Sequence, residues 1–177
     1  NLQELYDRLL ETLRALPGYD YEIIVADNCS TDGTRDMLRR IAARDPRFKV
    51  IFNANNFGQI RSSFNALLAA TGDCVVAMAS DLQNPPELIA EFVRQWESGN
   101  DVVIAVKKNS KESVAMRYVR KFYYGLLART SDAQKVIRDF TGFGLYDHKF
   151  IAALRKYNDP YPYFRGLVTE IGFKRAT

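Results

Sequence analysis

The sequence predicts an α/β protein with a mostly parallel sheet flanked by helices. Two observations lead to this prediction. Patterns typical of helices and of strands alternate along the first 106 of the 177 residues, and polar side chains follow directly after three of the predicted strands. Such alternation is typical of parallel sheets, in which crossover helices cover both faces. Because 47% of the residues are hydrophobic and no linker is visible, we expect a single domain over residues 1–177.

The chain opens on a predicted helix, with no strand before it. Leucines recur at helical spacing over residues 2–16, and Pro17-Gly18 ends this helix. The other elements of the first 106 residues are predicted strands over 21–26, 49–53, 74–79 and 101–106, and predicted helices over 34–44, 59–70 and 88–97. Continuous apolar runs such as 74–79 are typical of strands that are buried in a parallel sheet.

The character of the chain changes after residue 107. A polar loop leads into a predicted helix over 114–128, in which basic and aromatic residues alternate. This pattern fits a helix lying in a membrane interface, and it fits equally an ordinary surface helix whose long cationic stems cover apolar area. The remaining segments are a glycine-punctuated, semi-apolar stretch over 138–148, a short helix to about 156, a Pro- and Tyr-rich loop over 158–164, and a short helix and strand over 165–173.

Composition narrows the choice of partners. Lys and Arg exceed Asp and Glu by 25 − 21 = 4, which favours an anionic partner without choosing among phosphate, nucleic acid and membrane surface. No nucleic-acid-binding motif is present, so we expect no nucleic acid partner. The two cysteines, Cys29 and Cys74, are too few for a disulfide framework and predict a reducing, cytoplasmic setting.

A candidate metal site follows the predicted strand over 74–79. Asp81 and Gln83 come just after this strand, and Pro85-Pro86-Glu87 begins the next helix. Ligands of open α/β sheets bind outside the carboxyl ends of the strands. A carboxylate and an amide oxygen placed there suit a hard divalent cation that holds a phosphate. The alternative interpretation is that Asp81 only caps the following helix while Gln83 is solvated.

Two further polar loops follow predicted strands, one from Asp27 to Asp32 and one from Lys107 to Lys111. Carboxylates on two loops and cations on the third would suit a nucleoside diphosphate with its metal. Asp27 would accept a hydrogen bond from the base or ribose, and Lys107 would neutralise phosphate. The sequence contains neither a Walker loop nor a G-x-G-x-x-G fingerprint.

Four segments resemble motifs of family-2 glycosyltransferases with the GT-A fold. Residues 25–34, VADNCSTDGT, resemble their V-D-D-G-S-T-D-G-T loop, and residues 55–58, NNFG, resemble their N-x-G turn. Residues 80–87, SDLQNPPE, resemble the D-A-D-L-Q-x-P-P-E metal loop of the polyprenyl-phosphate branch, which includes dolichyl-phosphate mannosyltransferases and bactoprenol glucosyltransferases. Residues 139–147, DFTGFGLYD, resemble the acceptor segment D-x-T-G-x-F-R-L-Y of that branch.

The resemblance implies an inverting transfer of a sugar from a nucleoside-diphosphate sugar to a polyprenyl phosphate, undecaprenyl or dolichyl, at the cytoplasmic face of a membrane. Residues 1–107 would form the nucleotide-sugar part and residues 108–177 the acceptor part. The residues implied at the nucleotide sugar are Asp27, Asn28, Asp32, Gly58, Ser80, Asp81 and Lys107. Those implied elsewhere are Asp81 and Gln83 at Mg²⁺ or Mn²⁺, Asp139 at the reacting centre, and Arg117, Arg120 and Lys121 at the acceptor phosphate.

The sequence departs from the family pattern in four places. Ala79 replaces the first aspartate of the metal loop, Asn28 replaces the second aspartate of the nucleotide loop, and Gly144 replaces the arginine of the acceptor segment. The opening strand of the family is absent. Two alternatives therefore remain open: transfer to a saccharide, which would need Asp139 as a true general base, and a catalytically weak module that only binds nucleotide sugars.

Overall fold

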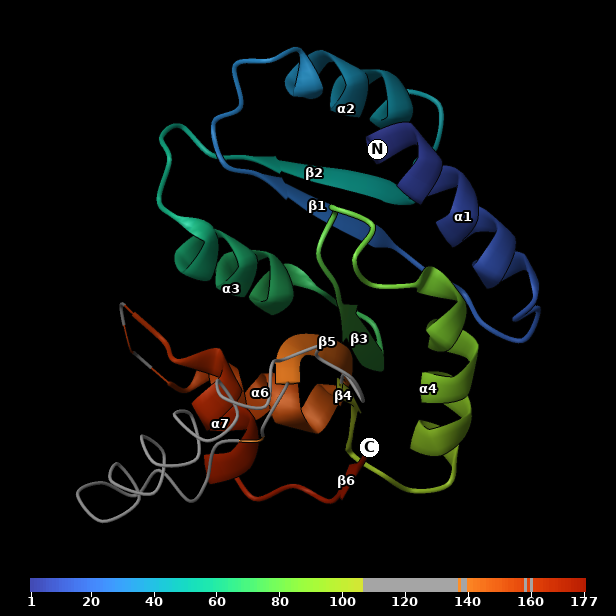
Figure 1. Cartoon of the computed structure of the whole chain (residues 1–177), viewed down its shortest axis with the longest axis vertical. Helices are drawn as coiled ribbons and strands as arrows, with labels where there is room; N and C mark the ends of the chain where they lie inside the picture. The colour runs from blue at the N-terminus through green and yellow to red at the C-terminus, as the bar shows by residue number, and fades with distance from the viewer. Residues whose placement is uncertain (107–136, 138–139, 158, 160) are drawn as a thin grey trace, which may run out of the picture.

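The structure is a computed structural model that describes residues 1–106, 137, 140–157, 159 and 161–177, and its α/β fold confirms the predicted class (Figure 1). The described helices are α1 (Leu2–Arg14), α2 (Thr34–Ala42), α3 (Gln59–Ala69), the 3₁₀ turn η1 (Pro86–Leu88), α4 (Ile89–Glu97), α6 (His148–Arg155) and α7 (Phe164–Glu170). The described strands are β1 (Ile23–Asp27), β2 (Phe48–Phe52), β3 (Cys74–Ala77), β4 (Val102–Val106), β5 (Phe140–Asp147) and β6 (Arg175–Ala176). The predicted helix over 114–128 lies outside the described residues.

The strands form two ladders. β1 and β2 pair in parallel, from Ile23 opposite Phe48 to Asp27 opposite Phe52. The second sheet has the order β3-β5-β4-β6, in which β5 runs antiparallel to both of its neighbours and β4 runs parallel to β6. The sheet is therefore mixed, and no ladder joins β1 to β3 within the described residues. Helix α2 packs on β2, α3 on β1, and α4 on β4 and β5.

Strand β5 was not expected from the sequence, which predicted only a glycine-punctuated segment there. The strand lies between β3 and β4, with Gly144 opposite Ala77 on one side and Ile104 on the other. A Cβ atom at residue 144 would lie 2.4 Å from the backbone oxygen of Val103. The arginine that the family pattern has at this position therefore has no room in this pairing, which gives a physical reason for Gly144.

The hydrophobic core joins the two halves of the chain. Tyr146 and Phe150, both fully buried, stack with ring centroids 5.3 Å apart and pack with Val102 and Ile104 of β4. Burial raises the pKa of Tyr146, and its hydroxyl donates to the backbone oxygen of Gly142. Residues before 107 and residues after 139 therefore contribute to the same hydrophobic cluster. No helix in the described parts of the chain is both long and apolar enough to cross a bilayer.

Candidate functional site

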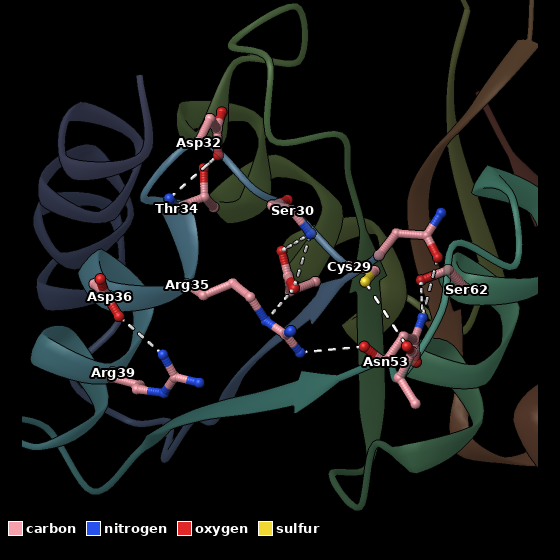
Figure 2. Close-up of polar contacts among 12 residues, drawn as sticks. Cys29, Ser30, Asp32, Thr34, Arg35, Asp36, Arg39, Asn53 and Ser62 are labelled. Atoms are coloured by element: carbon pink, nitrogen blue, oxygen red, sulfur yellow. Dashed lines mark hydrogen bonds and ion pairs between the residues drawn. The ribbon is translucent and has the colours of Figure 1, made fainter.

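Asp27 ends β1 with only 1% of its side chain exposed. Its carboxylate accepts from the backbone N–H of Ser30 and lies 3.0 Å from Nε of Arg35 on α2. That Nε is not aligned for a hydrogen bond, so the attraction between the charges holds the pair. Arg35 reaches across the loop to Asn53, and its Nη2 donates to the backbone oxygen there at 3.1 Å (Figure 2). The protein itself thus supplies partners for the Asp27 carboxylate, whose predicted contact with a nucleotide stays a prediction.

Asn28 connects the loop after β1 to the turn before α3. Its Oδ1 accepts from the backbone N–H of Phe57 at 2.9 Å, and its Nδ2 donates to Oδ1 of Asn56 at 2.6 Å. The same oxygen of Asn56 also accepts from the N–H of Gly58 at 2.9 Å. Asn53 extends this network, because its Nδ2 donates both to Asn28 Oδ1 and to the hydroxyl of Ser62 (Figure 2). Asn28 and Gly58, both predicted at the nucleotide sugar, are therefore brought together.

Asp32 marks the start of α2. Its carboxylate accepts from both the hydroxyl and the backbone N–H of Thr34, and these bonds lower the pKa of Asp32 (Figure 2).

Cys29, two residues after Asp27, has φ = 67°, a left-handed conformation that is uncommon for any residue but glycine. Arg35 and Arg39 both lie over the ring of Phe52, 5.1 and 4.9 Å from its centroid, so cations gather at the end of β2.

The loop after β3 carries the predicted metal ligands. Ser80, Asp81 and Gln83 are all exposed, and Asp81 Oδ1 accepts from the backbone N–H of Gln83 at 3.1 Å. The buried Asn84 closes the loop, since its Oδ1 accepts from the N–H of Ala79 at 2.9 Å. Within the described residues, no three His, Cys, Asp or Glu side chains gather into a metal cluster. A cation here would therefore need further oxygen ligands from a bound phosphate or from water.

An ion pair from α1 and a cavity lie next to the loop after β3. Arg8 on α1 donates from Nε and Nη2 to the two carboxylate oxygens of Glu87, each at 2.9 Å, and so ties α1 to η1. A cavity of about 140 Å³ adjoins the loop. Its lining residues are Gln83, Asn84, Pro85, Leu88, Ala105, Val106, Thr141 and Phe143. Strands β4 and β5 thus contribute to the same hollow as the predicted metal ligand Gln83.

Several predicted site residues cannot be located. Lys107, Arg117, Arg120, Lys121 and Asp139 lie outside the described residues, so their predicted roles stay predictions. In the part of the chain that the structure describes, no hydrogen bond or ion pair joins the loop after β1 to the loop after β3. The site residues that sequence reasoning missed are Arg35, Asn53, Asn56, Ser62 and Asn84. Asn53 had a recognisable signal, because it is the polar last residue of the strand predicted over 49–53.

Comparisons with known proteins agree with the motifs. The model of the family described as glycosyl transferase family 2 matches residues 1–159. An uncharacterized glycosyltransferase, YkcC, of Bacillus subtilis is 33% identical over 99% of this chain and 54% of its own length. A prophage bactoprenol glucosyl transferase homolog of Escherichia coli is 26% identical over 96% of this chain and 56% of its own. The chain thus spans about half the length of the curated relatives that it matches.

Solved structures agree on the fold. The mannosyltransferase PcManGT from Pyrobaculum calidifontis, solved in complex with GDP-Man and Mn2+, has a TM-score of 0.55 and 19% identity, over 97% of this chain and 50% of the other. The Staphylococcus aureus protein TarS, residues 1–349, has a TM-score of 0.52 and 16% identity, over 96% of this chain and 56% of the other. These likenesses show a fold shared with GT-A-type enzymes. Together with the family match over most of its length, they show that this chain belongs to glycosyl transferase family 2.

Proposed function

We propose that this chain is the catalytic domain of an inverting glycosyltransferase. It would transfer a sugar from a nucleoside-diphosphate sugar to a polyprenyl phosphate at the cytoplasmic face of a membrane, with Mg²⁺ or Mn²⁺ as cofactor. Residues 1–107 would bind the donor and residues 108–177 the acceptor. The observation that carries the proposal is the loop after β3, in which Asp81 and Gln83 are both exposed, Gln83 lines a cavity, and buried Asn84 holds the loop closed.

The oxygen ligands of this loop fit a hard cation bound together with a diphosphate. Asp81 uses one carboxylate oxygen for the Gln83 N–H, which leaves the other oxygen free for a metal ion. Mg²⁺ is commonly bound through one or two carboxylates together with substrate phosphates and water. A site with a single carboxylate, as Ala79 leaves it, would therefore bind the cation mainly when the nucleotide is present. When bound, the cation would neutralise charge on the departing diphosphate.

The reaction itself is a single displacement at the sugar. An acceptor oxygen attacks C1 from the face opposite the leaving group, the new C1–O bond forms, and the bond to the diphosphate breaks with its electron pair remaining on the nucleotide. An acceptor phosphate monoester is largely ionised at neutral pH, since its second pKa is near ~6. Asp139 would then orient the acceptor rather than remove a proton, and Lys107 would neutralise phosphate.

The proposed acceptor is supported by the relatives. Bactoprenol glucosyl transferases are among the proteins similar to this chain. The one of Shigella phage SfX is 26% identical over 95% of this chain and 55% of its own length. The basic residues Arg117, Arg120 and Lys121 would attract an acceptor phosphate. Because PcManGT was solved with GDP-Man and Mn2+, a guanine nucleotide and Mn²⁺ are the first ligands to test.

The test is calorimetric titration of GDP and of UDP, each with and without Mn²⁺, into the chain and into Asp81→Asn. We expect one nucleotide to bind only with the metal, and at least about tenfold more weakly in the variant, because a charged ligand oxygen is lost. The control is Asp7→Asn, since Asp7 is an exposed carboxylate on α1 whose contact is with Gln3. If a nucleotide binds with the same affinity without Mn²⁺ and in Asp81→Asn, the proposed metal site is wrong. If neither nucleotide binds, the proposed donor site is wrong.

A further inference from the structure

Two segments far apart in the sequence expose an unusual amount of apolar surface. Phe57 and Ile60, at the start of α3, are 46% and 60% exposed, and Tyr161 and Tyr163, before α7, are 70% and 53% exposed. Tyr157, in the segment between α6 and α7, is 42% exposed. Most of the large hydrophobic side chains that the described residues expose therefore belong to these two segments. A concentration of this kind is typical of a surface that meets a partner.

Arg61 joins the two segments into one surface. Its guanidinium lies 4.9 Å from the ring centroid of Tyr161 and 6.0 Å from that of Phe57. In Figure 1 the start of α3 and the chain that enters α7 lie on the same side of the molecule. We use the name aromatic patch for the surface formed by Phe57, Ile60, Arg61, Tyr161 and Tyr163.

The chemistry of the aromatic patch matches an anionic lipid surface. Tyrosines combine an apolar ring with a polar tip, and they are enriched where a protein meets lipid headgroups. The two segments, residues 54–66 and 155–165, carry four basic residues and one acidic residue, which are Arg61, Arg155, Lys156, Arg165 and Asp159. A basic surface with exposed rings gains both from electrostatic attraction to anionic headgroups and from burial of apolar area.

The aromatic patch also lies beside the candidate donor loop. The backbone N–H of Phe57 donates to Oδ1 of Asn28, and the N–H of Gly58 donates to Asn56. A membrane that covers the patch would therefore lie next to the loop that follows β1. We propose that the aromatic patch docks this domain onto an anionic membrane and so brings a lipid phosphate within reach of the site. This inference rests on the proposed function for its purpose, but vesicle binding tests it separately.

The experiment measures partitioning of the chain onto vesicles of phosphatidylglycerol and phosphatidylethanolamine by flotation, with no nucleotide or metal present. We expect binding to these vesicles and little to phosphatidylcholine. The variant Phe57→Ser/Tyr161→Ser should bind about tenfold more weakly at every salt concentration, because the loss is apolar. Arg61→Glu should bind about tenfold more weakly at low salt, and the difference should shrink in high salt because exposed charges are screened.

The controls change the same residue types on other elements. Tyr19→Ser removes a tyrosine exposed elsewhere, and Arg40→Glu reverses an exposed charge on α2. Neither should alter partitioning, and circular dichroism should show every variant folded. The proposal is wrong if the patch variants bind like the parent chain or if the chain binds no vesicles. It is also wrong if light scattering finds a dimer that Phe57→Ser/Tyr161→Ser dissociates, since a second copy would then cover the patch.

Discussion

The two loops of the candidate site are built differently. The loop after β1, residues 27–34, is held by an ion pair with Arg35 and by side-chain hydrogen bonds of Asn28 with Asn53 and Asn56. The loop after β3, residues 79–84, has one bond within its exposed tip and one anchor, Asn84. Both contain a non-glycine residue with positive φ, at 67° for Cys29 and 63° for Leu82.

This difference separates a preformed surface from one that a ligand would complete. A loop whose polar groups already have partners keeps its shape without a ligand, whereas exposed and partly unpaired oxygens are available to a cation. We infer that the first loop fixes where a nucleotide lies and that the second changes most when metal and diphosphate bind. The following variants test this contrast.

The largest expected effect is the loss of the buried ion pair in the first loop. Arg35→Met leaves the Asp27 carboxylate buried without its cation and should reduce the free energy of unfolding by about 2–3 kcal/mol, less than for a fully buried pair because Arg35 is 29% exposed. Urea denaturation measures it. Arg39→Met, which breaks an exposed pair with Asp36, should cost less than about 0.5 kcal/mol. Equal decreases in the free energy of unfolding of the two variants would show that the Arg35–Asp27 pair stabilises the fold no more than an exposed ion pair does.

The second effect concerns the anchor of the metal-side loop. Asn84→Ala leaves the Ala79 N–H without its acceptor and should cost about 1–2 kcal/mol of unfolding free energy. It should also weaken metal-dependent nucleotide binding, because the loop that carries Asp81 and Gln83 would lose its bond to the Ala79 N–H. Asn100→Ala, which removes an amide from the turn after α4, is the matched control and should leave nucleotide binding intact. Unchanged binding in Asn84→Ala would mean that the loop needs no anchor.

The amide of Asn28 offers a finer test. Asn28→Asp keeps the acceptor for the Phe57 N–H but loses the donor to Asn56, whose oxygen also accepts from Gly58. We expect a loss of about 1 kcal/mol in unfolding free energy, although the change restores the residue of the family pattern. Asn55→Asp should be neutral, since Asn55 contributes the oxygen that accepts from the Asn56 N–H, and aspartate keeps that acceptor. A stabilised Asn28→Asp variant would contradict the amide network.

Glycine substitutions compare the two left-handed residues directly. Cys29→Gly should raise the free energy of unfolding by up to about 1 kcal/mol, because glycine adopts positive φ without steric cost. Leu82→Gly relieves the same strain but removes a side chain that packs against the core around Phe92, so it should not stabilise. Thermal melts of both variants measure the change in stability. Equal stabilisation would mean that the packing of the Leu82 side chain contributes no stability.

The smallest effect depends on pH. The Thr34 hydroxyl and N–H lower the pKa of Asp32, so this carboxylate stabilises the folded state above its unfolded pKa of about 3.9 and loses that contribution as pH falls through the lower folded value. The difference in urea midpoint between the parent chain and Asp32→Asn should therefore narrow from pH 6 to pH 3. A difference that stays constant over this range would exclude the carboxylate charge as its source.

Local patterns predicted the first half of this fold and not its central strand. Apolar runs of three to six residues after glycine or polar turns located β1 to β4, because those strands read as largely hydrophobic segments. Gly142 and Gly144 hid β5, since glycine weakens a strand pattern while the reason for Gly144 is a backbone neighbour about 40 residues away.

The site divided in the same way. Motifs and positions after predicted strands selected Asp27, Asn28, Asp81 and Gln83 as candidates, and their roles stay predictions. The partners that hold those loops, such as Arg35 and Asn84, serve by contacts that only the folded arrangement creates. Their residue types are common on helices and in turns, so the sequence alone gave no reason to select them.

The insertion of β5 between β3 and β4 sets the order in which this protein can fold during synthesis. Cys74 pairs with Asp147, 147 − 74 = 73 residues later, and β3 and β4 do not pair with each other. Among the strands that the structure describes, a nascent chain that ends before Phe140 can pair only β1 with β2, and the edges of β3 and β4 stay open, which favours aggregation. Completion of the sheet must wait for a late segment, so β3 and β4, before residue 107, depend on β5, after residue 139, for their pairing.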